Sequence, residues 1–289
     1  EPWATVPDWK GASSGQVKAL VRAQAALHGT YWCPAENHPN LSFCRSRKGL
    51  SWIEAIKMLY SKDETKTPKW VPRLFDAFEK HFANAFMSLS HADCRPGNML
   101  YAKTAVVGDT AAKAKAGDDD WEVIMTDWEA LSITPFLWDL TYLTTIGQSV
   151  DERRIRFDDQ IKTYIDSLFA WNADAKRQLL EVHGDKLMEN LTNESALLVV
   201  CIWFFGAILA AIGGVGEVQG NTEDDCNAWS YRLGTAIVDL IDPEKFGAIL
   251  KAGDAQVVKD LKSLVENAEG MVKASSEPKI SGSDDKKNV

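Results

Sequence analysis

The residues with the clearest capacity for chemistry lie in one short stretch, residues 91–100, which reads HADCRPGNML. It offers a carboxylate at Asp93 and an amide at Asn98. Pro96 and Gly97 between them predict a tight turn, which would bring the two side chains to one side of a loop. We expect a short apolar strand to follow this loop.

A second acidic turn, MTDWE, follows at residues 125–129, after the apolar run Trp121–Met125. That run predicts a strand that ends by presenting Asp127. Phosphoryl transfer needs an acceptor held in line and charge neutralised on the phosphates. In such chemistry Asp93 would take or orient the proton of an acceptor hydroxyl. Asn98 and Asp127 would supply a neutral and an anionic oxygen to Mg²⁺, which prefers few carboxylates together with phosphate oxygens.

Two other residues of the loop are expected to assist. Arg95 would steady an anionic group, and His91 would brace the loop by hydrogen bonds. Cys94 lies beside the acid, and we interpret it as a buried thiol without a role in the chemistry.

The loop resembles the H-G-D-x-x-P-G-N signature of the superfamily of aminoglycoside phosphotransferases, choline kinases and ecdysteroid-kinase-like (CHK kinase-like) proteins. MTDWE is similar to the I-D-W/F-E/Q turn of that superfamily, and Pro135-x-x-x-Asp139-Leu140 is similar to its P-x-x-D-L segment. Two positions depart from the signature. Ala92 replaces the usual glycine and constrains the backbone before the acid, and Arg95 stands where His or Trp is common.

The resemblance implies a protein-kinase-like fold and an ATP- and Mg²⁺-dependent small-molecule kinase. By this resemblance Asp93 is the catalytic base, Asn98 and Asp127 are metal ligands, and Asp139 supports the loop from the following helix. The acceptor would be a small hydroxylated metabolite, choline-like, steroid or aminoglycoside, and no residue selects among these. The resemblance covers only a C-terminal lobe, starting at the helix whose sequence ends with Trp32.

Composition limits the alternatives. The 289 residues include 32 basic and 41 acidic side chains, a net charge of −9 that argues against a general nucleic-acid or anionic-membrane binder. The five cysteines contain no C-x-x-C pair and no zinc spacing, which favours a reducing compartment. The chain begins at Glu1 and shows no signal peptide. We therefore expect a cytoplasmic protein.

Hydrophobic periodicity predicts a mainly α protein with a small β-hairpin, an α+β fold. We divide the chain into an irregular first segment (1–15), a kinase-like lobe (16–273) with a flexible hairpin insert (102–120), and a disordered polar tail (274–289). A capping box at Ser51 would start one helix. The other predicted helices cover residues 16–32, 69–86, 139–145, 156–171, 174–190, 195–212, 223–241, 243–251 and 255–273.

The sequence before residue 91 lacks the usual elements of a kinase N-terminal lobe, namely a glycine-rich loop, a lysine on a strand and a partner glutamate. The N-terminal β lobe is therefore apparently absent, and no ATP-binding residue of that lobe is found. This leaves a second interpretation open, a non-catalytic kinase-like binding module or an inactive fragment.

Residues 196–216 carry no charge and are long enough to span a bilayer. Their flanks are Glu194 and Glu217 rather than Lys or Arg, and glycines interrupt the last third. A large helical lobe also needs one helix that is buried on all sides. We expect a core helix here, and a membrane-anchored protein is the third interpretation.

Overall fold

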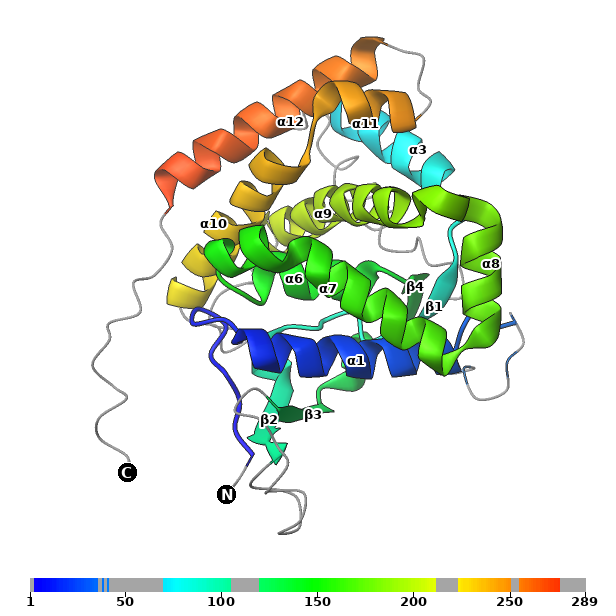
Figure 1. Ribbon diagram of the computed structural model, residues 1–289. Coiled ribbons are helices and arrows are strands. Elements are labelled where there is room, and N and C mark those ends of the chain that lie inside the picture. Colours follow the sequence, from blue (N-terminus) through cyan, green and yellow to red (C-terminus); the bar gives the residue numbers. More distant parts are fainter. Residues whose placement is uncertain are drawn as a thin grey trace.

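The computed structural model describes residues 3–35, 38, 41, 70–104, 120–211, 223–250 and 255–275. These residues are mainly helical, as expected, with short antiparallel strands (Figure 1). The helices are α1 (Ser14–Thr30), α3 (Trp70–Phe82), α6 (Trp138–Ile146), α7 (Val150–Trp171), α8 (Ala173–His183), α9 (Leu187–Ala211), α10 (Glu223–Leu240), α11 (Pro243–Ile249) and α12 (Ala255–Ala274). The strands are β1 (Met87–Ser90), β2 (Met99–Lys103), β3 (Trp121–Met125) and β4 (Ser132–Pro135).

The strands form two separate two-stranded sheets within the described residues. β2 pairs antiparallel with β3, with Tyr101 opposite Val123, which confirms the expected hairpin. β1 pairs antiparallel with β4, with Leu89 opposite Ile133, a pairing that the sequence did not predict. The loop of residues 91–98 therefore leaves one sheet and enters the other, so both of its ends are fixed.

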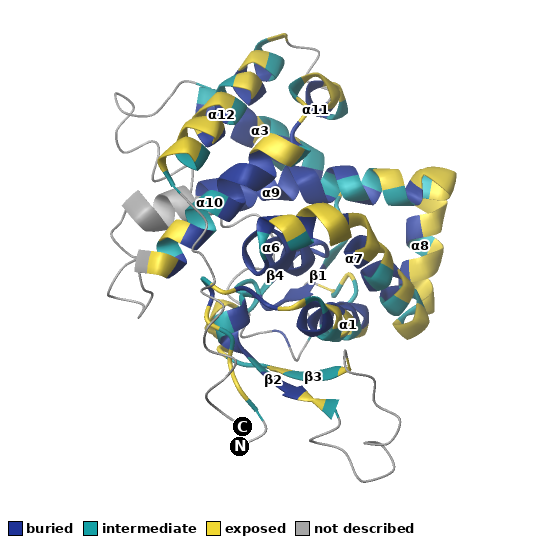
Figure 2. Cartoon of the chain, turned by 60° about the vertical axis from the view of Figure 1, so that its left-hand side comes forward, coloured by how far each residue is buried: buried dark blue, intermediate teal, exposed yellow. Residues whose placement is uncertain are grey.

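Helix α9 occupies the middle of the molecule (Figure 1). The helices α3, α11 and α12 lie on one side of it, and α1, α7 and the β2–β3 hairpin lie on the opposite side. The outer helices α7, α8 and α12 show exposed faces, whereas α9 is buried over most of its length (Figure 2). Most of the described interior is one large hydrophobic cluster, and a smaller cluster contains Leu41, Leu89 and Ile133. The large cluster includes Cys94 and Met99, so the core of the fold is continuous with the support of the 91–98 loop.

The burial of the middle of α9 explains why its residues 196–204 carry no charge. Its side chains from Ser195 to Cys201 are all buried against neighbouring helices. A helix packed on every side needs apolar residues all round, which removes the usual amphipathic pattern. Among the described helices, none combines the length and the apolar character needed to cross a bilayer. Residues 212–216 of the segment considered above lie outside the described residues.

Several helices begin where a side chain caps the first turn. Ser13 caps α1 in a capping box, since its hydroxyl accepts from the backbone N–H of Gln16 while the Gln16 side chain accepts from the N–H of Ser13. Ser149 caps α7 and Asn172 caps α8 through one bond each, in which the side-chain oxygen accepts a backbone N–H of the first turn. Each cap satisfies backbone donors that the first turn leaves open.

One predicted helix was wrong. Residues 174–190 do not form a single helix, because α8 ends at His183 and Gly184 takes a positive φ of 53°. A short 3₁₀ turn follows, and α9 begins at Leu187, eight residues before the predicted start at Ser195. Glycine is the residue that adopts positive φ most readily, so the chain changes direction here.

Several predictions lie outside the described residues. They are the helix after Ser51, most of the 102–120 insert and residues 276–289 of the tail. The division into three segments and the absence of an N-terminal lobe stay predictions.

Candidate active site

Asp139 organises the start of the loop from the first turn of α6. Its carboxylate accepts the backbone N–H of His91 at 2.8 Å and the backbone N–H of Ala92 at 2.9 Å. The side chain is fully buried. Burial opposes its ionisation, but the contact with His28, the electrostatic influence of His91 and the backbone N–H of Ala92 outweigh this and lower the pKa of Asp139 below its ordinary value. A charged Asp139 therefore fixes the backbone immediately before Asp93.

His28 of α1 supports Asp139 from behind. Its Nε2 lies 3.1 Å from Oδ2 of Asp139, and its Nδ1 lies 2.6 Å from the hydroxyl of Tyr164. Tyr164 in turn donates to the carbonyl oxygen of Phe136 at 2.9 Å. The ring of His28 is fully buried. The network ties α1, α6 and α7 to the loop.

Ala92 has a positive φ of 66°. This left-handed conformation costs a residue with a Cβ about 1–2 kcal/mol, and glycine adopts it freely. The conformation follows from the two hydrogen bonds to Asp139, which turn consecutive amides of His91 and Ala92 toward one carboxylate. The loop therefore holds alanine where a glycine fits with less strain.

Replacing Ala92 by Gly is expected to raise the free energy of unfolding by about 0.5–1 kcal/mol, because relief of strain exceeds the extra backbone entropy of glycine. Ala102 in β2 is the matched control, since it is buried and its φ is negative. The change Ala102→Gly should lower stability by about 1 kcal/mol. Urea unfolding of the two variants measures the difference, and an equal loss in both would contradict the argument.

His91 joins the loop to the acidic turn. Its Nε2 lies 2.6 Å from the carbonyl oxygen of Thr126, and its Nδ1 lies 3.3 Å from the backbone N–H of Asp93. Since a carbonyl only accepts and an amide N–H only donates, the ring carries its proton on Nε2. The indole of Trp128 lies against the ring at 4.8 Å between centroids. His91 thus links the backbones of the two segments that carry the acids.

Asp93 receives donors on both carboxylate oxygens. The hydroxyl of Tyr142 donates to Oδ1 at 3.0 Å, and the amide of Asn98 donates to Oδ2 at 2.8 Å. Burial and the adjacent negative charge raise the pKa of Tyr142 well above its usual range, so the phenol stays a neutral donor. Asp93 itself keeps 30 % of its side-chain surface. The carboxylate is oriented and still reachable from solvent.

Asn98 and Asp127 offer side-chain oxygen atoms of the kind that bind a cation. The Asn98 amide nitrogen is used by the carboxylate and the backbone carbonyl of Asp93, so its amide oxygen is the atom left for a cation. The backbone carbonyl of Asn98 accepts both the N–H and the hydroxyl of Thr126, at 2.9 and 2.7 Å. Thr126, the residue before Asp127, is therefore bound directly to the backbone of Asn98.

Asp127 is exposed and takes a left-handed conformation with φ of 60°. Within the described part of the chain, its carboxylate has no hydrogen-bond or ion-pair partner, and no three His, Cys, Asp or Glu side chains gather as a metal cluster. One carboxylate and one amide oxygen suit Mg²⁺, which takes few protein ligands and fills its octahedron with phosphate oxygens and water. The donor set fits this metal.

The structure reveals a residue that the sequence did not suggest, Asp8. Its Oδ2 accepts from Nη1 of Arg95 at 2.6 Å, and its Oδ1 accepts from the backbone N–H of Gly97 at 2.7 Å. Burial raises the pKa of Asp8, while Arg95 and Gly97 oppose that shift. Arg95, which we expected to steady an anionic ligand, is already bound to this carboxylate. No motif marks Asp8, because it lies in the irregular first segment.

That first segment is part of the site. Arg232 of α10 is buried and donates to the backbone carbonyls of Asp8 and Trp9, both at 2.7 Å. Ala4 forms an antiparallel bridge with Tyr101 of β2, using hydrogen bonds of 3.0 and 2.8 Å. The segment therefore runs from the β2–β3 hairpin to α10 and contacts the 91–98 loop through Asp8. Figure 1 shows it as the blue trace that starts at the label N.

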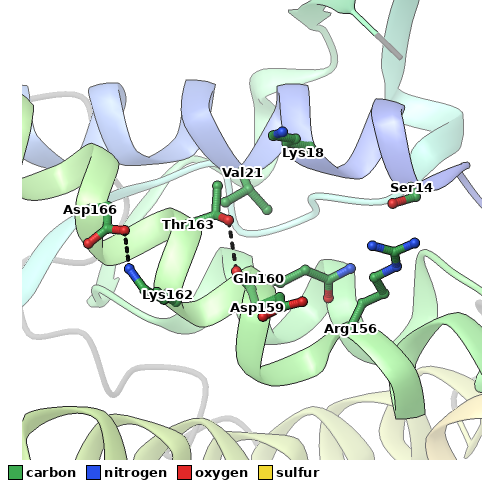
Figure 3. A pocket seen from close by; sticks show the side chains of 9 residues that line it. All are labelled: Ser14, Lys18, Val21, Arg156, Asp159, Gln160, Lys162, Thr163 and Asp166. Carbon is green, nitrogen blue, oxygen red and sulfur yellow. Dashed lines mark hydrogen bonds and ion pairs between the residues drawn. The ribbon is translucent and has the colours of Figure 1, made fainter. Parts of the chain in front are cut away.

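A hollow of about 300 Å³ lies elsewhere, between α1 and α7 (Figure 3). Lys18, Arg156 and Lys162 line it together with Asp159 and Asp166. Lys162 is bound to Asp166 at 2.6 Å, and these side chains are exposed at the rim. No residue of the 91–98 loop contributes to this hollow. It is a furrow between two helices, and neither Asp93 nor Asp127 lines it.

No protein-family model and no curated protein matches this chain. Among solved structures, the chain is similar to a choline/ethanolamine kinase family protein from Mesorhizobium loti. The two share 14 % sequence identity with a TM-score of 0.43, over 92 % of this chain and 72 % of that chain.

Proposed function

We propose that this chain is a kinase-like phosphotransferase lobe that uses Mg²⁺ and ATP to phosphorylate a hydroxyl of a small metabolite. The hydrogen bond from the Asn98 amide to Asp93 carries the proposal. It places a neutral oxygen ligand for a cation beside an oriented carboxylate. This is the combination that phosphoryl transfer to a hydroxyl requires.

Asp93 is the proposed base. Tyr142 and Asn98 hold one donor on each carboxylate oxygen, which fixes the plane of the carboxylate. Oδ1 keeps a lone pair for the proton of an incoming hydroxyl, whereas Oδ2 also accepts a longer contact of 3.3 Å from Nε of Arg95. A positioned base of this kind contributes about 10²–10⁴-fold to rate.

The proposed metal ligands are Asn98 and Asp127. Bound Mg²⁺ would neutralise charge on the phosphates of ATP. Thr126 would hold the two ligands close to each other, because its N–H and its hydroxyl both donate to the Asn98 carbonyl. His91, at the other end of the loop, contacts the carbonyl oxygen of Thr126. Asp139, fixed by His28, sets the backbone on which Asp93 stands.

Thermal unfolding of the purified chain with and without Mg·ATP tests the proposal. Ligand at about a hundred times its Kd stabilises the folded state by about 2.7 kcal/mol, so the unfolding temperature must rise. The rise should require Mg²⁺ and should be lost in Asp127→Asn. Glu129→Gln is the matched control, because Glu129 is exposed in the same turn and carries the same charge.

The possible outcomes separate the interpretations. A Mg²⁺-dependent rise that is lost in Asp127→Asn but kept in Glu129→Gln supports the metal assignment. A rise that persists in Asp127→Asn contradicts the assignment and favours a kinase-like module that binds ligand elsewhere. Absence of any rise with Mg·ATP contradicts nucleotide binding by this chain.

A further inference from the structure

One guanidinium lies between two carboxylates at the candidate site. Arg95 contacts Asp8 through Nη1 at 2.6 Å and Asp93 through Nε at 3.3 Å. The first distance is that of a short, charge-assisted hydrogen bond, whereas the second exceeds the usual range for N–H···O contacts. Arg95 is therefore bound mainly to Asp8, and Asp93 holds it only weakly.

Several contacts hold Asp8 in the position where it binds Arg95. Its second oxygen accepts the Gly97 amide, and its own carbonyl accepts Arg232. A Cβ on residue 97 would lie 3.1 and 3.2 Å from the two Asp8 oxygens, so glycine lets the carboxylate approach closely. Asp8 is thus fixed on both its side chain and its backbone.

The guanidinium of Arg95 also lies over the indole ring of Trp229. Its central carbon lies 5.7 Å from the ring centroid of Trp229 on α10. Charged and titratable groups of the described residues near this pair include Tyr142, which donates to Asp93, and Asp225, which accepts the backbone N–H of Trp9 at 2.8 Å. Of the two carboxylates that the described structure shows in contact with Arg95, Asp8 has the shorter contact.

We propose that Asp8 is a positioning residue that draws Arg95 away from Asp93 and so leaves the Asp93 carboxylate available to the acceptor hydroxyl. The role of Asp93 in this statement rests on the proposed function, whereas the competition between the two carboxylates does not. Without Asp8, the guanidinium would close on Asp93 as a two-pronged ion pair, the geometry that arginine prefers with a carboxylate. Arg95 would then take the lone pairs of Asp93 that Tyr142 and Asn98 leave open.

Eight variants test the competition without any need for activity. They combine Asp8→Asn, Asp93→Asn and Arg95→Gln in all possible ways, including the wild type. Urea unfolding gives the coupling between Asp93 and Arg95 with and without Asp8. Removal of Asp8 should strengthen that coupling about tenfold in the unfolding equilibrium constant, about 1.4 kcal/mol. Equal coupling in the two backgrounds would overturn the proposal. Should Asp8→Asn fold too poorly, Asp8→Ser replaces it and still offers an oxygen to Gly97.

Turnover tests the consequence for the reaction. Asp8→Asn should lower kcat about tenfold, a part of what a positioned base contributes, with a smaller effect on KM. Adding Arg95→Gln to Asp8→Asn should restore activity, because the competing guanidinium is then gone. A purely structural role for Asp8 predicts no such rescue. A double variant that is no better than Asp8→Asn would overturn the catalytic part of the proposal.

Asp260→Asn is the matched control. Asp260 is also a buried aspartate bound to one arginine, Arg73, through two hydrogen bonds of 2.8 and 2.7 Å, but it joins α12 to α3. This variant should lose stability and keep kcat. A wild type that phosphorylates no acceptor would count against the proposed function, and the unfolding comparison would then decide on Asp8 alone.

Discussion

Replacing Asp93 by Asn is expected to lower kcat for phosphoryl transfer about 10²–10⁴-fold, the usual contribution of a positioned general base. Asn has nearly the same shape, but its amide nitrogen cannot accept a proton and would face the donors from Tyr142 and Asn98. Transfer of the γ-phosphoryl group from labelled ATP to a panel of small hydroxylated compounds measures the loss. If the proposed function holds, stabilisation by Mg·ATP should persist, since the proposed metal ligands Asn98 and Asp127 remain.

The control for this prediction is Asp174→Asn. Asp174 lies at the start of α8 and is 76 % exposed in its contact with Arg177, so loss of its charge should leave kcat unchanged. Turnover of Asp93→Asn at the wild-type rate would rule out Asp93 as the base. Loss of Mg·ATP stabilisation together with turnover would instead point to a folding defect in the loop.

Replacing Asp139 by Asn is expected to destabilise the protein by about 3–5 kcal/mol, the usual cost of breaking a buried charged pair. The carboxylate accepts two backbone amides and His28, and an Asn at this position would turn a donor toward at least one of these donors. The same change should lower kcat, because the backbone of the 91–98 loop loses its anchor. Urea unfolding at neutral pH measures the stability.

The dependence on pH gives this prediction a sign. The folded-state pKa of Asp139 lies below its ordinary value of 3.8, so the unfolded state binds more protons when this group titrates. Its contribution is therefore complete above pH 3.8 and is lost as the pH falls through the lower, folded value. The stability difference between wild type and Asp139→Asn should shrink on acidification. A difference that stays constant down to that range would contradict a charged Asp139.

The pKa of another acid, Glu194, is also shifted, so the effect of pH must be read from the difference in stability between wild type and Asp139→Asn. Burial raises the pKa of Glu194 in α9 from 4.5 to about 7. A raised acid pKa stabilises the folded state at low pH, and that contribution is lost as the pH rises through this interval. Glu194 is present in both proteins, so its effect cancels when the two curves are subtracted.

The parts of the fold that local patterns encode were predictable. The loop, the strand Trp121–Met125 and most helices follow from motif spacing and hydrophobic period, because both are properties of neighbouring residues. Gly184 was missed because apolar residues keep helical spacing on both sides of it, while its positive φ is set by the turn between α8 and α9. Strand β4 was missed because four residues carry too little pattern.

The support of the candidate site was much less predictable. Asp8, Tyr142 and Arg232 carry no motif, and each acts through a partner far away in the sequence. Their roles depend on which buried donors and acceptors face each other after packing, which a local pattern does not specify. The resemblance indicated that Asp139 supports the loop, but not that His28 contacts the Asp139 carboxylate.

The first segment has a consequence for the order in which the protein folds. Asp8 meets Gly97 across 89 residues, and its carbonyl meets Arg232 across 224 residues. Contacts between such distant positions form slowly, because chain entropy must be lost before they contribute. Helices and hairpins can form from local contacts long before these ones exist. During refolding, helical structure should therefore recover well before the proposed nucleotide binding, and the delay would report the closure of Arg232 over the first segment.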